Sequence, residues 1–295
     1  MPVVRLALVL VLLAALSPAR AQTTPWDGLP QIIDALAAQH PEATVAVAVR
    51  AADGRRYDRL AGRSFHAAST MKVALMVEAY RRDADGSLPL ATRLPVHNTF
   101  RSLADGSPFA VSADSDEAIY KRLGDSLSVR DLVERAITIS SNLATNLLVE
   151  ALSAEAVQAT VERLGAAGLE VRRGVDDLRA FEAGLSNRTT AAALAALLEA
   201  LRDGRAVSPE ADAAMRDVLA RQTFRDMIPA GLPADVRVAH KTGTISRVNH
   251  DAGIVYPPGA PPYVLVILTE GLADEAVSSR LGAAISAAVY AALAP

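Results

Sequence analysis

The chain contains no cysteine among its 295 residues. Disulfides are therefore excluded and no thiolate is available to hold zinc, so stability must come from a packed core. Histidine is also scarce, and the five histidines lack the spacing of a metal site: His40, His66, His97, His240 and His250. No Gly-x-Ser-x-Gly segment is present. These absences disfavour metal-dependent chemistry, and we expect neither a metal nor a cofactor.

Aromatic residues make up only 4% of the sequence, and no stretch combines them with a basic stripe. The formal net charge is −3, and it becomes −5 once Arg5 and Arg20 of the N-terminal segment are removed, since 28 basic and 33 acidic residues remain. A mildly acidic chain of this kind is a poor partner for nucleic acid. We therefore expect a small-molecule ligand and no nucleic-acid partner.

The first 21 residues have the pattern of a cleavable signal peptide. Arg5 gives a short basic start, residues 6–16 form an apolar run too short to cross a bilayer, and Ala19-Arg20-Ala21 provides a cleavage site. We expect a mature chain from about Gln22, periplasmic or secreted, with no membrane anchor after cleavage. Its roughly 274 residues suffice for one large domain or two closely packed ones. We expect a monomer.

Lysine is rare in this chain, because only Lys72, Lys121 and Lys241 stand among thirty basic residues. Lys72 follows Ser69 by three positions, and the apolar spacing after them predicts a helix beginning near Ser69. The two side chains therefore share one face of that helix, one turn apart. A serine hydroxyl needs a neighbour to take its proton, and a desolvated lysine can lose its own proton whereas arginine cannot. Alone, such a pair is more often a helix cap beside a solvated charge.

Hydrophobic periodicity predicts strands, then many helices, then strands again and a final helix. A first helix is expected over residues 31–39, and the predicted strands cover residues 43–50, 56–60, 236–241, 252–256 and 263–269. After the helix at Ser69, the predicted helices cover residues 128–137, 142–152, 154–164, 190–202, 209–221 and 275–293. Residues 87–125 and 169–187 carry weaker signals, so we expect long loops there.

This order of elements predicts an α+β fold with three α/β/α layers. Two early and three late strands share one five-stranded antiparallel sheet flanked by the terminal helices, and an all-helical lobe is inserted between them. We expect an α/β lobe made of residues 22–66 and 205–295 and a helical lobe made of residues 67–204, within one catalytic domain over 22–295. The crevice between two such lobes is the usual place for a small-molecule site.

Two further stretches carry polar side chains at positions suited to chemistry. Ser140-Ser141-Asn142 connects two predicted helices, and by itself it is typical of a helix cap. His240-Lys241-Thr242-Gly243-Thr244 ends a predicted strand, where glycine permits close approach of a ligand to the backbone. By itself that segment is more often an ordinary strand end. Together, Ser-x-x-Lys, Ser-x-Asn about seventy residues later and Lys-Thr-Gly about a hundred residues beyond form an ordered set.

In this order the three motifs resemble those of the class A β-lactamases and penicillin-binding proteins, a family of active-site serine hydrolases. The resemblance extends over nearly all of the mature chain. It implies that Ser69 attacks the lactam carbonyl and becomes the acyl-enzyme, and that Lys72 is the general base or part of a proton relay. Ser140 would pass a proton to the departing nitrogen, with Lys241 nearby tuning that hydroxyl.

The resemblance also implies a set of substrate contacts. Asn142 would hydrogen-bond the substrate side-chain amide, and the backbone N–H groups of Ser69 and Thr244 would form the oxyanion hole. Lys241 would hold the substrate carboxylate. The residues implied for substrate binding are Asn142, Lys241, Thr242, Gly243, Thr244 and Arg247. Asn146, one helical turn past Asn142, would buttress the connection before it.

The chain departs from the family pattern in two places. The middle residue of Ser-x-Asn is Ser141 where the family usually has Asp, and we interpret this as a structural change because that side chain points away from substrate in the family. The loop before the helix at 190–202 lacks the Glu-x-x-Leu-Asn with which class A enzymes position the deacylating water. Asp176 or Asp177 is the best substitute by position, and we assign Asp176 as catalytic. Glu182 lies too close to the next helix. A solvated, arginine-paired loop is the alternative interpretation of all three acids.

That loop separates three possible functions. If a carboxylate there activates water, the acyl-enzyme turns over and the protein is a β-lactamase, which is the function we favour. Without such a carboxylate the same serine and lysine would acylate and stall on β-lactams, as expected of a D-alanyl-D-alanine peptidase that uses peptidoglycan peptides. A catalytically silent cell-wall binding protein is the third possibility, and the intact set of Ser69, Lys72, Ser140, Asn142 and Lys241 disfavours it.

Overall fold

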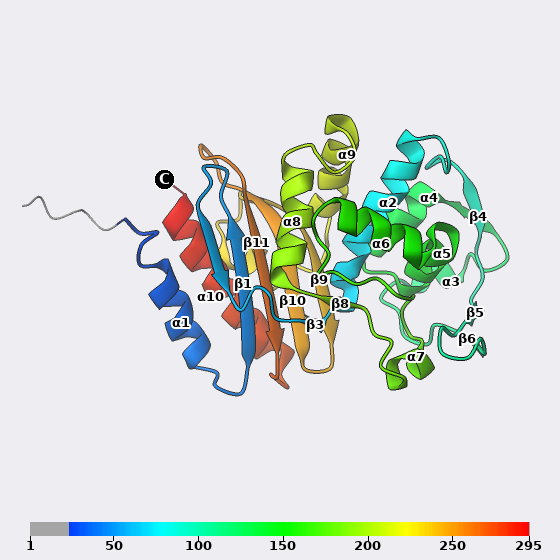
Figure 1. The fold of residues 1–295 in the computed structure, drawn as a ribbon, viewed down its shortest axis with the longest axis horizontal. Coiled ribbons are helices and arrows are strands. Elements are labelled where there is room, and N and C mark those ends of the chain that lie inside the picture. Colours follow the sequence, from blue (N-terminus) through cyan, green and yellow to red (C-terminus); the bar gives the residue numbers. More distant parts are fainter. Residues whose placement is uncertain (1–23, 295) are drawn as a thin grey trace, which may run out of the picture.

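The computed structural model describes residues 24–294, so the predicted signal peptide over 1–21 lies outside the described residues. Its centre is an antiparallel sheet of five strands in the order β2-β1-β11-β10-β9 (Figure 1). These strands span Thr44–Arg50 (β1), Arg56–Arg59 (β2), Arg237–Ile245 (β9), Val248–Tyr256 (β10) and Tyr263–Glu270 (β11). The predicted α+β fold with a five-stranded antiparallel sheet is confirmed, and β9 forms one edge of the sheet.

Two of the strands are longer than their apolar pattern predicts. β9 continues through the Lys-Thr-Gly motif to Ile245, where the sequence predicts a strand end at Lys241. β10 begins at Val248, ahead of the predicted start at Ala252. The apolar pattern misses this start because the residues between them are polar although they are buried in the sheet: Asn249, His250 and Asp251. The prediction that the motif ends its strand is therefore wrong. The motif lies within a continuous edge strand, which holds its backbone by pairing with β10.

Helices α1 (Leu29–Ala38) and α10 (Glu275–Leu293) cover one face of the sheet (Figure 1). The valines of β1 pack with these helices and its alanines pack on the opposite side, as the two-residue period of a strand requires. α10 is long and apolar enough to cross a membrane by length and composition alone. Its buried residues nevertheless pack in this core layer: Leu281, Ile285 and Val289.

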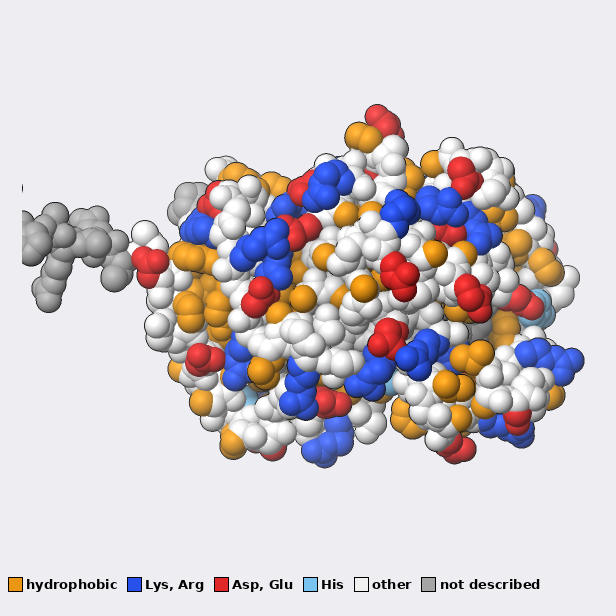
Figure 2. Space-filling view, viewed as in Figure 1, with side chains coloured by type: hydrophobic (Ala, Val, Ile, Leu, Met, Phe, Trp, Pro, Cys, Tyr) orange, Lys and Arg blue, Asp and Glu red, His pale blue; other side chains and the backbone are white. Residues whose placement is uncertain are grey.

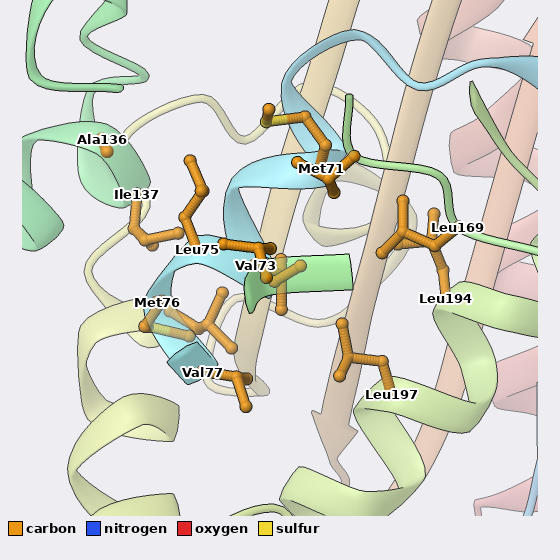
Figure 3. Close-up of a cluster of buried hydrophobic side chains, with 14 of the residues drawn as sticks. Met71, Val73, Leu75, Met76, Val77, Ala136, Ile137, Leu169, Leu194 and Leu197 are labelled. Atoms are coloured by element: carbon orange, nitrogen blue, oxygen red, sulfur yellow. The ribbon is translucent and has the colours of Figure 1, made fainter. Parts of the chain in front are cut away.

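The opposite face of the sheet carries α8 (Ala191–Arg202) and, beyond it, the helical lobe (Figure 1). α2 (Lys72–Ala84) runs through the middle of that lobe and is buried from Lys72 to Tyr80. The helices that surround it are α4 (Val129–Thr138), α5 (Asn142–Leu152), α6 (Ala154–Arg163) and α9 (Pro209–Ala220). Figure 3 shows apolar side chains of α2 with their neighbours from α4 and α8, among them Leu75, Ile137 and Leu197. This layer supports the helix on which Lys72 lies.

Short elements occupy the regions where the sequence signal is weak. They are β3 (Phe65–His66), β4 (Arg93–Pro95), β5 (Phe100–Arg101), β6 (Pro108–Phe109), α3 (Glu117–Tyr120), β7 (Ser126–Ser128), α7 (Leu178–Glu182), β8 (Arg188–Thr189) and the 3-10 turn η2 (Pro229–Gly231). Strands of two or three residues show no periodicity in a sequence. The predicted loop over 87–125 contains the pair β5–β6 and the helix α3, and the predicted loop over 169–187 contains α7 and a bridge from Glu170 to Arg188, so both hold more hydrogen-bonded structure than the pattern reveals.

Ion pairs and hydrogen bonds attach α8 to the sheet. Glu199 on α8 pairs with Arg56 of β2 at 3.0 Å, and Arg202 donates to the backbone oxygen of Arg50 at 2.8 Å. The predicted division after residue 204 assigns α8 to the helical lobe; in the structure α8 packs on β1 and β11 of the sheet. Basic and acidic side chains lie interspersed over the face shown in Figure 2.

Candidate active site

Ser69 lies in a single 3-10 turn, η1 (Ala68–Met71), that runs directly into α2. Gly243 of β9 packs against this turn, and a Cβ on Gly243 would come within 2.9 Å of Ser69 N and 3.0 Å of Thr70 N. Only a residue without Cβ allows the two backbones to approach this closely. The glycine of the Lys-Thr-Gly motif therefore determines how near β9 lies to Ser69.

Lys72, the first residue of α2, is fully buried. Its Nζ donates to the Ser140 carbonyl oxygen at 2.7 Å, to the Ser140 Oγ at 3.2 Å and to the Asn142 Oδ1 at 3.0 Å. Burial lowers the pKa of Lys72 to about 7, although the carboxylates of Asp114 and Asp176 oppose the shift. Near neutral pH a large share of this amine is therefore unprotonated, which is the form a general base requires.

Ser140 occupies the connection between α4 and α5, with φ at +59°. Its Oγ accepts hydrogen bonds from two lysines, at 3.2 Å from Lys72 Nζ and at 3.1 Å from Lys241 Nζ. Lys241 is fully buried on β9, and burial together with the nearby charge of Lys72 lowers its pKa well below the usual range. The structure thus brings the Ser-x-Asn and Lys-Thr-Gly motifs together around one hydroxyl.

A cleft of about 250 Å³ opens beside these residues. Predicted site residues from all three motifs line it: Ser69, Ser140, Asn142, Thr242, Gly243 and Thr244. Further side chains complete its walls: Ser115, Phe224, Asp226, Met227, Asn249, Glu275 and Ser279. Three sequence motifs that lie far apart in the chain therefore meet at one surface.

Arg247 lies outside this cleft. It occupies the turn between β9 and β10 with φ at +60°, and its Nη2 donates to the carbonyl oxygen of Gly271. It lines a neighbouring hollow together with Val248 and Leu272. That hollow shares Thr244, Asn249 and Glu275 with the cleft, so Arg247 lies next to it, and its implied contact with a substrate carboxylate stays a prediction.

A second hollow of about 370 Å³ shares Ser69, Asn142 and Thr244 with the cleft. Large apolar side chains line it from α7 and from the end of β9, and they are unusually exposed: Leu178 at 69%, Phe181 at 51% and Ile245 at 40%. Exposed apolar surface of this kind, next to a candidate nucleophile, fits an apolar part of a ligand.

Asp177 borders this second hollow, but its carboxylate already accepts three hydrogen bonds from the protein. It is buried and accepts hydrogen bonds from Ser102 Oγ at 2.7 Å, from Leu103 N at 2.8 Å and, as the N-cap of α7, from Ala180 N at 3.1 Å. Removing those donors would leave a buried charge without partners. Asp177 therefore holds the loop in place and is not available to a water molecule.

Asp176 borders the same hollow, and its carboxylate accepts fewer and longer hydrogen bonds than that of Asp177. Its Oδ2 accepts only long hydrogen bonds, from Ser112 N at 3.3 Å and Ala113 N at 3.5 Å, and its charge acts on Lys72. Its φ of +62° is unusual for a residue with a Cβ. Glu182 is exposed at the end of α7 and borders neither hollow. Among the three candidate acids, Asp176 is the one with accepting capacity beside Ser69.

Asn146 of α5 holds the loop that carries Asp176. Its Nδ2 donates to Val175 O at 3.0 Å and its Oδ1 accepts from Val175 N at 2.7 Å. A Cβ on Gly174 would lie 2.3 Å from that Oδ1, so a larger residue there would displace the amide from its two hydrogen bonds. The resemblance implies that Asn146 supports the connection before α5, whereas its side chain instead clamps residues 174–175.

Sequence reasoning did not identify Asp114. Its carboxylate accepts from Asn142 N at 3.0 Å and from Leu143 N at 2.8 Å, at the start of α5. Asp114 lies in the long irregular segment 87–125, and these contacts join residues 28 and 29 positions apart. No local spacing reports such a contact, so the sequence offered no signal for it.

The turn carrying Ser69, the two buried lysines and the inter-lobe cleft define an active-site serine hydrolase of the class A β-lactamase type. Residues 28–293 match the model of the beta-lactamase enzyme family, and the chain belongs to that family. A β-lactamase of Streptomyces lavendulae is 31% identical over 275 residues, covering 89% of this chain and 88% of that protein. The β-lactamase structure from Sphaerobacter thermophilus DSM 20745 has a TM-score of 0.76 at 27% identity, covering 90% of this chain and 96% of that one. The structure of PBP-A has a TM-score of 0.78 at 25% identity, covering 89% and 94%.

Proposed function

We propose that this protein hydrolyses β-lactams through an acyl-enzyme on Ser69. The observation that carries this proposal is the contact of two buried amines, Lys72 and Lys241, with the hydroxyl of Ser140, a residue that lines the same cleft as Ser69. The kinship with β-lactamases supports the same reaction. Bacteria that make such an enzyme break down β-lactam antibiotics and so resist them.

Acylation begins with the transfer of the Ser69 hydroxyl proton to Lys72. The pKa of about 7 leaves enough unprotonated amine for this step near neutral pH. The Ser69 oxygen attacks the lactam carbonyl, and the backbone N–H groups of Ser69 and Thr244 stabilise the oxyanion. As the C–N bond of the ring breaks, Ser140 donates its proton to the leaving nitrogen and recovers one through its hydrogen bonds with Lys72 and Lys241.

Substrate binding uses both hollows beside Ser69. We assign Thr242 and Thr244, which line the cleft, and Lys241, which is buried on β9, to the carboxylate of the substrate, and Asn142 to the amide of its acyl side chain. The apolar residues of the second hollow receive the remainder of that side chain. This division favours β-lactams with an apolar acyl group.

Deacylation uses Asp176 as the base that activates water. Its free accepting capacity and its place beside Ser69 support this role, although its carboxylate stands on a shorter side chain than the glutamate of the family motif. The attacking water gives its proton to Asp176, and as the ester C–O bond breaks a proton returns to the Ser69 oxygen, so that the hydroxyl and the base are both regenerated.

A D-alanyl-D-alanine peptidase is the second candidate function. Two observations favour it besides the similarity to PBP-A. The Glu-x-x-Leu-Asn motif is missing, and the loop residue that the Asn146 amide holds by its backbone is Val175, which has no carboxylate to activate water. Such an enzyme would be acylated by β-lactams without turning them over.

One kinetic experiment separates the two functions. The purified protein is mixed with a chromogenic cephalosporin, and both the initial burst and the steady state are followed, with Ser69→Ala as the control that abolishes both. Sustained turnover supports the β-lactamase. A burst of one equivalent followed by no turnover contradicts it and supports the peptidase.

We also propose that the protein is exported by the segment over 1–21 and acts as a periplasmic or secreted monomer without a membrane anchor. N-terminal sequencing of the product recovered from the expressing cell, with light scattering of that product, tests both points. A mature chain that begins before residue 22, or a stable dimer, would contradict them.

A further inference from the structure

The connection that carries Ser140 lacks the carboxylate usual in the resembled family, since Ser141 stands in the middle of Ser-x-Asn. Ser141 is fully buried, and its Oγ accepts from Ala144 N at 3.3 Å as the N-cap of α5. The same Oγ donates to Asp114 Oδ2 at 3.4 Å. A carboxylate is therefore present at this connection, but a distant loop supplies it.

The carboxylate of Asp114 gathers donors from three segments. Besides Asn142 N at 3.0 Å and Leu143 N at 2.8 Å, it accepts from Asp116 N at 3.1 Å and from the Tyr120 hydroxyl at 3.2 Å. The first backbone N–H groups of a helix have no partner within the helix, so a carboxylate placed there is both hydrogen-bonded and favoured by the helix dipole. These bonds fix the start of α5 against the segment before α3.

We propose that Asp114 is a positioning residue of the active site, which supplies from a distant loop of the same chain the carboxylate that Ser141 lacks. The chain of contacts is short. Asp114 holds the backbone of Asn142, the Asn142 Nδ2 donates to the neighbouring Ala113 O at 2.9 Å, and the Asn142 Oδ1 accepts from Lys72 Nζ at 3.0 Å. Asp114 thereby sets the amide that orients Lys72 toward Ser140. The inference rests on the proposed acylation of Ser69, but not on which base completes the turnover.

Asp114 also acts on Lys72 through its charge. The charged groups around this amine are Asp114 from the segment before α3, Asp176 from the loop before α7 and Lys241 from β9. Asp114 raises the pKa of Lys72 against the effect of burial. Removing the charge of Asp114 should therefore shift the acidic limb of the acylation profile to lower pH, because Lys72 would lose its proton more readily.

The test measures the acylation rate constant of Ser69 with a fluorescent penicillin across pH, so that it does not depend on deacylation. For Asp114→Asn we expect about a tenfold lower plateau rate, as for the loss of a helix cap, and a midpoint moved to lower pH by up to about one unit. Asp114→Glu keeps the charge but displaces the hydrogen bonds, so its rate should fall while its midpoint stays. The matched control is Glu117→Gln, which removes an equal charge from an exposed position on the same segment.

A second variant tests whether a carboxylate at position 141 can replace the one at position 114. Adding Ser141→Asp to the Asp114→Asn background restores a carboxylate to the connection itself, and we expect it to recover most of the lost rate. The inference is overturned if Asp114→Asn acylates like Glu117→Gln, or if it loses thermal stability while plateau and midpoint stay unchanged, since the role is then only structural. A wild-type protein that is acylated without turnover would contradict the proposed hydrolysis and leave this comparison intact.

Discussion

At the residue scale, the protonation state of Lys72 controls the reactivity of Ser69. Burial holds the pKa of Lys72 at about 7, and only the unprotonated amine can accept the serine proton. We therefore expect log kcat/KM for a β-lactam to rise with pH and to level off above about pH 7. Lys72→Arg should lower kcat/KM by at least about a thousandfold, because a guanidinium keeps its proton. Steady-state kinetics across pH checks both, and a flat profile would remove Lys72 from the role of base.

Asp176 governs the second half of the reaction at the same scale. Asp176→Asn keeps the size of the side chain but removes the base, so we expect acylation to persist, with its midpoint at lower pH because Lys72 loses a neighbouring charge, and at least about a hundredfold loss in kcat. Mass spectrometry of the protein mixed with a penicillin should then show the acyl-enzyme persisting. The control is Glu182→Gln, an exposed acid at the end of the next helix, α7, that borders neither hollow. Unchanged turnover in Asp176→Asn would eliminate this carboxylate from the mechanism.

Lys241 is expected to act in substrate binding. For Lys241→Ala we expect kcat/KM to fall by at least about tenfold, mostly through KM, because the substrate carboxylate loses a hydrogen-bond donor and Ser140 loses one of its two donors. The measurement is kcat/KM against a series of β-lactams that carry the carboxylate. An unaltered kcat/KM would show that another group binds that carboxylate.

The residues of the site divide into those with a local sequence signature and those without one. Ser69 and Lys72 are one helical turn apart, so their spacing alone reports that they are neighbours. Ser140 and Lys241 were predicted through the ordered motifs, and the structure places both in contact. Asp114 and the changed role of Asn146 depend on how two irregular loops fold back on α5, which periodicity does not encode.

At the element scale, the position of Asp176 depends on a loop that α5 holds from outside. Gly174→Ala would place a Cβ 2.3 Å from Asn146 Oδ1, so either the Asn146 amide or the loop must shift, and both changes loosen the hold of α5 on the loop. A displacement of about 1 Å at a catalytic group can cost about a hundredfold in rate. We therefore expect Gly174→Ala to slow deacylation more than acylation, as pre-steady-state kinetics can resolve.

A double-mutant cycle tests whether the clamp is the cause. Asn146→Ala removes the atom that the new Cβ meets, so the Gly174→Ala and Asn146→Ala changes should be non-additive, the second adding little to the first. Additive losses would show that Gly174 acts through its own backbone freedom and not through Asn146.

The regular elements followed from periodicity and capping because both are local. Ser128 and Asp131 form the capping box that opens α4, as their spacing predicts. The early start of β10 could not be predicted in this way, because Asn249, His250 and Asp251 are polar side chains that are buried with hydrogen-bond partners from elsewhere in the chain. An apolar pattern cannot report a strand whose interior side chains are satisfied by hydrogen bonds from other elements.

At the scale of the whole molecule, two lobes meet across η1 and β9, and buried polar groups lie at that junction. His250 of β10 is fully buried there, with its Nε2 donating to His66 O at 3.0 Å and its Nδ1 accepting from Thr269 N at 3.2 Å. Both nitrogens are used only if the ring is neutral, because a protonated ring cannot accept. Burial accordingly lowers the pKa of His250 to about 4.

This buried ring makes the stability of the whole fold depend on pH. The folded pKa of His250 lies near 4, below its ordinary value of 6.5, so the unfolded chain binds the proton more readily. The stability is fully present above pH 6.5 and is lost as pH falls toward 4, by about 3 kcal/mol from this group alone. In His250→Gln, whose amide can both donate and accept, the free energy of unfolding measured in urea should fall less steeply over that interval. If the free energy of unfolding falls equally steeply with decreasing pH in the wild type and in His250→Gln, the His250 ring is not the group that makes the stability depend on pH.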